Sequence, residues 1–444
     1  MITILVIDKI SIQRSFQMKA VHIAVTLCFI AFGSIIYAQD QCKVVGWATQ
    51  NGGVTGGGTA TPVVVSNYND FKAKLTSKTD KVIHVSGTIT IPAGGRVTIQ
   101  DQTGKTIIGL PGSKIVSTDM TASGSGILYI KKCKDFIIRN LNFQGPGAYD
   151  NDGYDNLCID NCQNFWVDHC EFHDGMDGNF DIKNMSDFIS VTWCKFSYEK
   201  PPKAGGSGGS DDHRYSNLIG SSDGATDDAG KLNVTFYYCW WGEGVRERMP
   251  RMRFGKLHVV NCLYNSTVSN QCIRAGYKAD ILAEGNYFDK QKLPIDEYDK
   301  NYTAIKGVNN YGASDITKGS AFKPPYTVTI AKPADIVTPI KNCGGAKLSS
   351  PTGCSPCSGG TGIDNHSFAV EQNKSVLLTI SENGKTLTIK NQILVNPKQP
   401  VIITNALGET VVMESLSDNI DISKLNSGVY LFKSGNYNSM FIKK

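Results

Sequence analysis

The chain has 444 residues, enough for one large domain and a smaller one, and 41% of them are hydrophobic. The formal net charge of +5 is small and its basic residues are scattered, which argues against a nucleic-acid partner but is compatible with an acidic substrate. The 45 glycines predict a turn-rich soluble protein.

The first 38 residues have the pattern of a secretory signal. Lys19 precedes an uncharged run over residues 20–38, which ends in the small residue Ala38 at a position suited to cleavage. A membrane anchor is the alternative, because a run of this length is borderline for crossing a bilayer. We expect residues 1–38 to be removed and the mature protein, without a membrane segment, to be extracellular or attached to the cell surface.

A short helix is predicted after the irregular, Gly/Thr-rich residues 46–61. Asn67 can cap it, and Tyr68, Phe71 and Leu75 fall on one of its faces. We interpret this helix as a cap on a stack of strands. The first strands and rungs are expected at residues 81–85, 96–99, 105–108, 114–117, 126–130 and 136–143.

Five segments between Trp166 and Asn286 repeat one template, an apolar β-rich run followed by a small or polar residue, any residue and an aromatic. They are FWVDHCEF, FISVTWCKF, NVTFYYCWW, KLHVVNCLY and DILAEGNYF. The fixed position holds Cys170, Cys194, Cys239, Cys262 and Asn286, at intervals of 24, 45, 23 and 24 residues. Such a period is typical of a solenoid whose units bury their apolar faces by stacking. The pattern predicts an all-β protein, a right-handed parallel β-helix.

The cysteines of this repeat are predicted to be buried free thiols. Neighbouring parallel strands lie about 4.8 Å apart, whereas the Cβ atoms of a disulfide lie about 3.5–4.5 Å apart. Because an exported protein meets an oxidising environment, disulfides remain open among the other candidates. Those candidates are Cys42, Cys133, Cys343, Cys354 and Cys357.

The long interval of 45 residues contains an insertion, residues 199–231, which begins as a Gly/Ser-rich loop. The β-helix domain is expected over residues 39–342 and a Ser/Gly/Pro/Cys linker over 343–362. Alternating strands then follow, with an Asn383–Gly384 hairpin turn, which predicts a small C-terminal β-sandwich over 363–444.

Three aspartates are predicted to converge on one outer face of the β-helix. Asp155 and Asp177 are 22 residues apart, close to one period, and Asp181 follows in Asp-Gly-Asn-Phe-Asp. Carboxylates this close raise each other's pKa unless a cation lies between them. Oxygen-only ligands suit Ca²⁺ better than zinc or copper. The alternative is a set of solvated turn aspartates.

A second cluster holds four arginines in eight residues. Arg248 lies nine residues after Cys239 and should return to the face of the aspartates, with Arg251 and Arg253 after it and Pro250 stiffening the turn. Guanidinium groups beside an acidic cation site imply an anionic ligand, because arginine binds carboxylates with two parallel hydrogen bonds. Surface ion pairs with Glu243 and Glu247 are the alternative.

Together the segments WVDHCEF, DGNFDIKNMSDFISVTWCKF, SNLIGSSDG and RERMPRMRFGKLHVVNCLYN resemble the polysaccharide lyase family 1 pectate lyases over residues 45–340. The resemblance implies Ca²⁺-dependent β-elimination of polygalacturonate. It also implies that Asp155, Asp177 and Asp181 are Ca²⁺ ligands, with Asp152 as a further candidate. In the Arg-x-Pro-x-x-Arg motif, Arg248 resembles the catalytic base and Arg253 a ligand of the substrate carboxylate.

The chain departs from the family at one position. A substrate-binding lysine is usual in a His-x-Lys-x-x-Leu-Ile-Gly stretch, but here Tyr215 occupies that place after His213 and Arg214. Arg214 is the candidate replacement for the missing cation, and His213 is expected to be a hydrogen-bonding loop residue.

The C-terminal module resembles the type IX secretion sorting domains of Bacteroidetes, through NALGETVV, IDISKLNSGVYLFK and the terminal FIKK. A carbohydrate-binding sandwich is the alternative and would need exposed aromatic residues. The resemblances together predict a secreted monomer, exported through the type IX machinery, that cleaves de-esterified polygalacturonate. A metal-independent pectin lyase and a non-catalytic β-helix glycan-binding protein are the competing hypotheses.

Overall fold

The computed structural model describes residues 43–350, 374–375, 378–381, 385–389, 400–405, 410–415, 419–434 and 437–443. The predicted signal segment 1–38, Cys42, Cys354 and Cys357 lie outside these residues. The chain divides into two compact units between Gly360 and Thr361, and each unit is described by itself. No helix among the described residues is long and apolar enough to cross a membrane.

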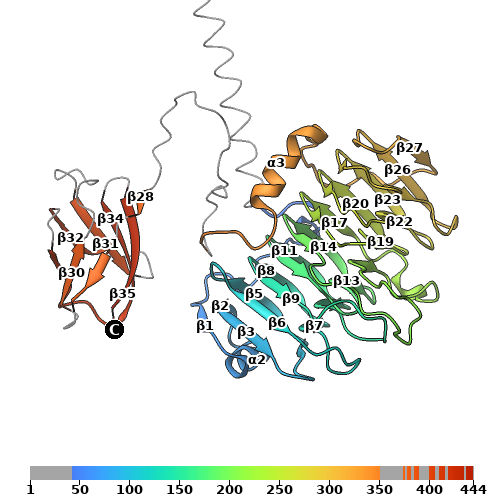
Figure 1. The fold of residues 1–444 in the computed structure, drawn as a ribbon. Coiled ribbons are helices and arrows are strands. Elements are labelled where there is room, and N and C mark those ends of the chain that lie inside the picture. The colour runs from blue at the N-terminus through green and yellow to red at the C-terminus, as the bar shows by residue number, and fades with distance from the viewer. Residues whose placement is uncertain are drawn as a thin grey trace, which may run out of the picture. The chain divides into compact units, whose positions relative to one another are not determined.

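The first unit confirms the predicted parallel β-helix, built from three long sheets, here called A, B and C (Figure 1). Sheet A contains, in spatial order, β1 (Val63–Val65), β2 (Val82–Val85), β5 (Thr103–Gly109), β8 (Lys134–Arg139), β11 (Gln163–Asp168), β14 (Asp187–Thr192), β17 (Val234–Tyr237), β20 (Lys256–Val260), β23 (Asp280–Glu284), β26 (Ala304–Val308) and β27 (Ile316–Lys318). Its pairs are parallel except β26 with β27.

Sheets B and C each have eight parallel strands. Sheet B contains β3 (Thr88–Ile91), β6 (Lys114–Ser117), β9 (Asn142–Gln144), β12 (Glu171–His173), β15 (Lys195–Ser197), β18 (Trp240–Trp241), β21 (Leu263–Tyr264) and β24 (Tyr287–Phe288). Sheet C contains β4 (Val97–Gln100), β7 (Leu128–Lys131), β10 (Leu157–Asp160), β13 (Phe180–Lys183), β16 (Leu218–Ile219), β19 (Arg251–Met252), β22 (Ile273–Ala275) and β25 (Ile295–Asp296). Each full rung thus contributes one strand to each sheet.

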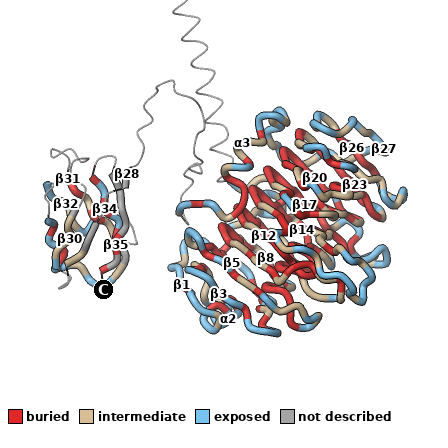
Figure 2. The backbone as a smooth tube through the Cα atoms, in the orientation of Figure 1, coloured by how far each residue is buried: buried red, intermediate tan, exposed pale blue. Residues whose placement is uncertain are grey.

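The interior is filled by like residues stacked on neighbouring rungs, and Figure 2 shows buried positions running along the strands. The rings of Phe143 and Phe172 stack at 4.8 Å, and those of Trp241 and Tyr264 also at 4.8 Å. These spacings match the distance between parallel strands, so one side chain per rung packs on its equivalent in the next. Burial of each such aromatic residue contributes roughly 1.5–3 kcal/mol.

The repeated cysteine position lies at the corner between sheets A and B. Cys170, Cys194, Cys239 and Cys262 are buried free thiols, as predicted. The Cys170 N–H donates to Sγ of Cys194, and the Cys262 N–H donates to Oδ1 of Asn286 at 2.9 Å. The side chain of one rung therefore satisfies a backbone donor of the rung before it, where the turn interrupts the sheet.

The residue before each ladder position turns the chain. His169, Trp193, Tyr238 and Asn261 all have φ between 47° and 55°, the left-handed region that bulky residues rarely adopt. The rings of Trp193 and Tyr238 stack at 4.4 Å. Stacking of this outer column helps to hold a backbone conformation that these side chains would otherwise disfavour.

A second ladder corrects one expectation from the sequence. Cys133, left open there as a disulfide partner, is a buried free thiol. Its N–H donates to Sγ of Cys162, whose own N–H donates to Oγ of Ser186 at 3.1 Å. The sequence template did not include this column, because cysteine and serine share it and no aromatic residue follows two residues after Cys133 or Cys162.

The helices cover the β-helix. The predicted cap is α2 (Tyr68–Thr76), with Asn67 as N-cap and Phe71 and Leu75 buried. The Lys105 ammonium group, itself buried, donates to backbone carbonyls at the end of this helix, including that of Ser77 at 2.7 Å. The other helices among the described residues of this unit are η1 (Gly46–Thr49), η2 (Thr226–Asp228) and α3 (Pro333–Cys343).

One expectation about the insertion is confirmed, and one about the linker differs. β14 pairs directly with β17, so the 45-residue interval is one rung with an insertion, as predicted, and that insertion contributes β16 to sheet C. At the predicted linker, the N–H of Leu348 donates to Oδ1 of Asn140 at 2.9 Å, so residues 343–350 pack on the β-helix.

The second unit has a five-stranded sheet and a three-stranded sheet that share one core, as predicted for a sandwich. The larger contains β28 (Lys374–Ser375), β35 (Tyr437–Lys443), β34 (Gly428–Ser434), β31 (Pro400–Asn405) and β32 (Thr410–Ser415); the smaller contains β29 (Leu378–Ile380), β30 (Thr386–Ile389) and β33 (Asn419–Asp421). Tyr430, Phe432 and Phe441 are buried in that core, so they do not form a sugar-binding surface.

Candidate active site

The three predicted aspartates lie together at sheet C. Asp155 precedes β10, Asp177 precedes β13, and Asp181 is on β13 opposite Cys158 of β10. They line one cavity of about 370 Å³. The spacing of about one rung between Asp155 and Asp177 therefore predicted their convergence correctly. Asp152 is exposed and does not line this cavity.

The electrostatics of the cavity are dominated by crowded carboxyl groups. Burial, together with the charges of Asp181 and Asp177, raises the pKa of Asp155 well above its usual value. Burial also raises the pKa of Asp181 to about 6, against the opposing effect of Arg248. Ionisation of Asp155 and Asp181 at neutral pH therefore costs free energy. A bound cation would offset that cost.

Asp177 is held differently. Burial opposes its ionisation, but a hydrogen bond with Nε2 of His213 at 3.0 Å and the charge of Arg248 lower its pKa below the usual value. The other ring nitrogen of His213 lies 3.3 Å from Oδ1 of Asp150. His213 is therefore a hydrogen-bonding loop residue, as the sequence suggested, and it orients one of the candidate ligands.

Two observations test whether these residues suit a calcium ion. Oδ1 of Asp155 is buried without a hydrogen-bond partner, which leaves a carboxylate oxygen facing the cavity unsatisfied. Gly178 leaves room beside it, since a Cβ there would stand 2.7 Å from that oxygen and 3.4 Å from Oδ1 of Asp181. An oxygen-only, anionic, open set of this kind fits Ca²⁺.

The aspartate set is more open than a closed ligand cluster. Among the described residues, one group has ligand atoms that all lie within 4.8 Å of one another, and it is His173, Asp174 and Glu199 rather than the aspartates.

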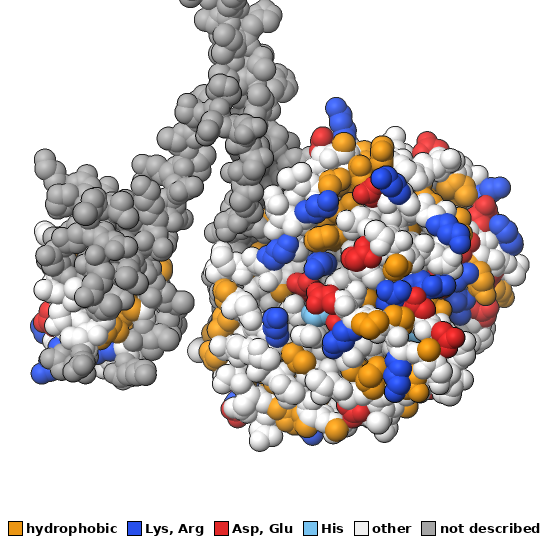
Figure 3. All heavy atoms as spheres, viewed as in Figure 1, with side chains coloured by type: hydrophobic (Ala, Val, Ile, Leu, Met, Phe, Trp, Pro, Cys, Tyr) orange, Lys and Arg blue, Asp and Glu red, His pale blue; other side chains and the backbone are white. Residues whose placement is uncertain are grey.

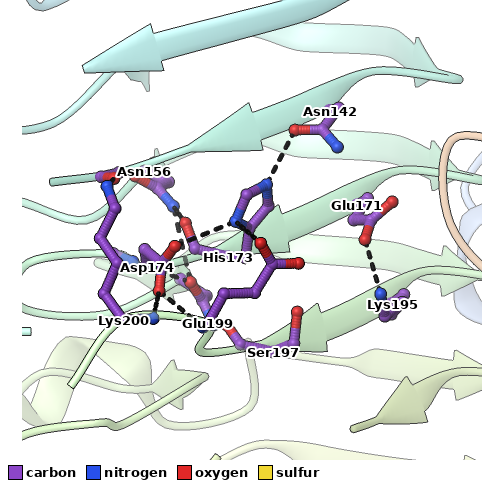
Figure 4. A network of polar contacts seen from close by, with 12 residues as sticks. Asn142, Asn156, Glu171, His173, Asp174, Lys195, Ser197, Glu199 and Lys200 are labelled. Atoms are coloured by element: carbon purple, nitrogen blue, oxygen red, sulfur yellow. Dashed lines mark hydrogen bonds and ion pairs between the residues drawn. The ribbon is translucent and has the colours of Figure 1, made fainter. Parts of the chain in front are cut away.

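Figure 4 shows how the His173 group fixes the start of the insertion. Oδ1 of Asp174 accepts the N–H groups of Glu199 at 2.8 Å and of Lys200 at 2.9 Å, while Oδ2 contacts Nδ1 of His173. Nε2 of His173 lies 3.1 Å from Oδ1 of Asn142. These contacts hold the first residues of the insertion against the rung that carries Asp177.

Arg248 faces the aspartates. It lies just before β19, half-buried, with φ of 58°, and its charge acts on all three carboxyl groups. Its guanidinium carbon lies 4.7 Å from the centre of the Tyr215 ring. The tyrosine that replaces the usual lysine thus stacks on the predicted base, a contact that sequence reasoning missed.

The other two predicted arginines are engaged with neighbours. Nε of Arg253 pairs with Asp223 at 2.6 Å, and Nη1 donates to the carbonyl of Gly220 at 2.9 Å. Arg214 binds both carboxylate oxygens of Asp212, at 2.7 and 2.6 Å. A substrate carboxylate would have to compete with these acids for the guanidinium groups. The competition is greater at Arg214, because two of its N–H groups already donate to the carboxylate of Asp212.

Burial and crowding among the arginines lower the pKa of Arg251. Burial, and then the charges of Arg253, Arg248 and Arg274, lower the pKa of Arg251 to about 10. A cluster of this kind destabilises its own protonated form and favours an anionic ligand. On the face of the β-helix unit seen in Figure 3, basic and acidic side chains are interspersed.

Further cavity residues were not identified from the sequence. Arg96, Tyr129, Tyr154 and Lys183 line the same cavity as the aspartates. Lys183 could have been found, since it lies two residues after Asp181 on one strand and must share its face. Arg96 lies two rungs before Asp155 and three rungs before Lys183, and only the register of the strands shows that it approaches this site.

Comparison with known proteins places the chain among enzymes that act on pectate. A family model described as pectate lyase matches residues 23–336. Pectate lyase E of Dickeya chrysanthemi is 32% identical over 349 residues, covering 69% of this chain and 86% of that protein. A pectate lyase mutant of Bacillus subtilis matches with a TM-score of 0.56 and 22% identity, covering 68% of this chain and 96% of that one. A pectate lyase bound to a hexasaccharide matches with a TM-score of 0.55, 21% identity and coverage of 68% and 96%.

Proposed function

Because the chain belongs to the pectate lyase family, we propose that it cleaves de-esterified polygalacturonate by Ca²⁺-dependent β-elimination, with Arg248 as the base. The observation that carries this proposal is the unsatisfied Oδ1 of Asp155, buried among like charges and facing Arg248. A buried carboxylate of this kind needs a positive partner. Asp155, Asp177 and Asp181 would hold the ion.

The reaction removes the C5 proton of a galacturonate unit and breaks the bond between C4 of that same unit and the glycosidic oxygen O4, which stays attached to C1 of the neighbouring unit. The electron pair of the C5–H bond becomes the C4=C5 double bond, and O4 leaves and takes a proton. When bound, Ca²⁺ would supply positive charge to the C6 carboxylate as negative charge develops on it. Arg253 would support the same carboxylate once the substrate displaces Asp223.

Arg248 would accept the C5 proton. Free arginine has a pKa above about 12, so a neutral guanidinium needs a special environment. Half-buried Arg248 lies three residues before Arg251, whose pKa is lowered to about 10 by burial and by the neighbouring arginines. Stacking on Tyr215 would fix the plane of the guanidinium group and so the direction of its nitrogens.

Two other hypotheses remain distinguishable. A metal-independent pectin lyase acts on neutral methyl esters and has no use for three converging carboxylates. A non-catalytic glycan-binding protein has no use for an arginine that faces them and forms no ion pair with the residues that the structure describes. The proposed function accounts for both features.

The test is the ultraviolet absorbance of the unsaturated product, measured on polygalacturonate and on highly methylated pectin, with and without EDTA. We expect product from polygalacturonate that disappears in EDTA and returns with added Ca²⁺. Full activity on methylated pectin in EDTA would favour the pectin lyase, and no product from either substrate would favour a binding protein.

We also propose that the protein is a secreted monomer. Residues 363–444 would act as a type IX secretion sorting domain, supported by the motifs at its end and by the burial of Tyr430, Phe432 and Phe441, which leaves those rings unavailable for sugar binding. Deletion of residues 363–444 should trap the protein inside a host that has this export machinery. Normal export of the shortened protein would remove the proposal.

A further inference from the structure

Arg96 lines the aspartate cavity and takes no part in the proposed elimination step. It directly precedes β4, which is the edge strand of sheet C. Arg248 precedes β19, which lies toward the other edge of the same sheet. The strand order places β10 and β13, which lie just after Asp155 and Asp177, between β4 and β19. Arg96 and Arg248 therefore flank the aspartates on opposite sides along the axis of the β-helix.

Two aromatic rings hold the Arg96 guanidinium group in place. Its central carbon lies 3.4 Å from the ring centre of Tyr154 and 4.9 Å from that of Tyr129. The Tyr129 hydroxyl donates to Oδ2 of Asp160 at 2.7 Å, which fixes that ring. Rings that contact the flat faces of a guanidinium leave the N–H groups at its edge free to form hydrogen bonds.

The charge of Arg96 has no acidic partner among the residues that the structure describes, and it lines the cavity half-buried. Lys183, in the same cavity, differs. It lies on β13, two residues after Asp181, and so has an acid of the cavity beside it. Lys183 thus balances the cavity's own acids, whereas the positive charge of Arg96 is left for a ligand.

We propose that Arg96 binds the carboxylate of a substrate galacturonate unit on the far side of the aspartates from Arg248. This inference rests on the proposed function. A polygalacturonate chain carries one carboxylate per unit, and successive strands of sheet C lie about 4.8 Å apart. A chain laid across these strands presents repeated carboxylates to the Arg96 end, where a rigid guanidinium can form two parallel hydrogen bonds.

The test is the steady-state kinetics of Arg96→Ala on polygalacturonate. Arg96 lies away from the reacting atoms, so its loss removes binding that is equal in the ground and transition states. We expect KM to rise about 10-fold with kcat within about 2-fold, as for one lost charge-assisted pair. Arg96→Lys should show a smaller rise. Lys114→Ala, which removes an exposed charge from sheet B, is the matched control and should leave both constants unchanged.

A second measurement separates binding from a structural role. We expect Arg96→Ala to shift the position at which short oligogalacturonides are cleaved, and its KM penalty to shrink on partly methyl-esterified chains. An unchanged KM and cleavage pattern would overturn the proposal, as would an equal penalty on esterified chains. If Arg96→Ala does not fold, Tyr154→Leu and Arg96→Lys decide by the same criteria. Wild-type protein without activity on polygalacturonate would instead overturn the proposed function.

Discussion

The corner between sheets A and B and the outer face of sheet C differ in how residue types repeat from rung to rung. At the corner between sheets A and B, the residue type repeats, and Cys170, Cys194, Cys239 and Cys262 each occupy the same position. On the outer face of sheet C the residue type at the equivalent position varies along the β-helix. In register it holds Tyr129, Cys158, Asp181, Leu218, Arg251 and Arg274.

The difference lies in how each side satisfies its polar groups. At the corner, each side chain accepts a hydrogen bond from the backbone of the rung before it, as Cys194 does for Cys170. At sheet C, Asp155 keeps an unsatisfied buried oxygen, and its carboxyl group is crowded by two others. The corner supplies stability that the site does not, so changes at the two sides should have separable effects.

The largest expected effect comes from Arg248→Lys at the site. Lysine cannot place two nitrogens in the guanidinium plane that Tyr215 supports, and loss of a positioned base typically costs about 10²–10⁴-fold in rate. We expect kcat to fall by about 10³-fold with an unchanged melting temperature. Arg246→Lys, a neighbouring half-exposed arginine paired with Asp212, is the control and should change kcat by less than about 2-fold. Retained activity in Arg248→Lys would remove Arg248 from its role.

Gly178→Ala tests the space between the carboxylates. The new methyl group would stand 2.7 Å from Oδ1 of Asp155, so that carboxylate would have to move away. We expect roughly 100-fold lower kcat/KM, equivalent to about 2.7 kcal/mol, together with a raised Ca²⁺ requirement. Gly428→Ala in the other unit, where a Cβ meets ordinary contacts, should have no effect on these quantities. Equal kinetics for both variants would show that the ion does not need Gly178.

The effect of Asp181→Asn on thermal stability should depend on pH and on Ca²⁺. The pKa of Asp181 is raised from 3.8 to about 6, so its stabilising contribution is fully present below pH 3.8 and is lost as pH rises through about 6. In EDTA we expect the variant to be more stable than the wild type at pH 7, by on the order of 2 kcal/mol, and equally stable near pH 4. Added Ca²⁺ should reverse the order at pH 7. Thermal unfolding across this range is the measurement, and a wild type more stable at pH 7 in EDTA would contradict the account.

The smallest effect is expected at the ladder. Cys194→Ala removes the acceptor of the Cys170 N–H and should lower the free energy of unfolding by about 1–3 kcal/mol. Below the unfolding transition, kcat should be unchanged. Cys194→Ser should cost less, since Ser186 already fills the equivalent position in the second ladder. A change in kcat without a change in stability would mean that the two sides of the rung are coupled.

The features that follow from the period of the repeat could be predicted from the sequence. The contacts that depend on the register between distant segments could not. The ladder, the cap at Asn67 and the convergence of Asp155 with Asp177 all follow from spacing along the chain. The stacking of Tyr215 on Arg248 depends on how the insertion folds back, which no period encodes. The same is true of Arg96 and Tyr154, which are 58 residues apart and meet only through the register of sheet C.

Local pairing also altered one expected role. Arg214 was predicted to replace the missing lysine, but Asp212, two residues earlier, binds both sides of its guanidinium fork. An acid at that spacing in a turn could have been weighed in the sequence. A substrate role for Arg214 stays a prediction.

The most direct test is equilibrium binding of Ca²⁺ to the chelator-treated protein, with a short oligogalacturonate present, for the wild type and for Asp181→Asn. The account predicts Ca²⁺ binding by the wild type that is lost or weakened at least about 10-fold in the variant, since one anionic ligand is gone. Equal binding by both proteins, or none by the wild type while it still forms unsaturated product, would contradict it.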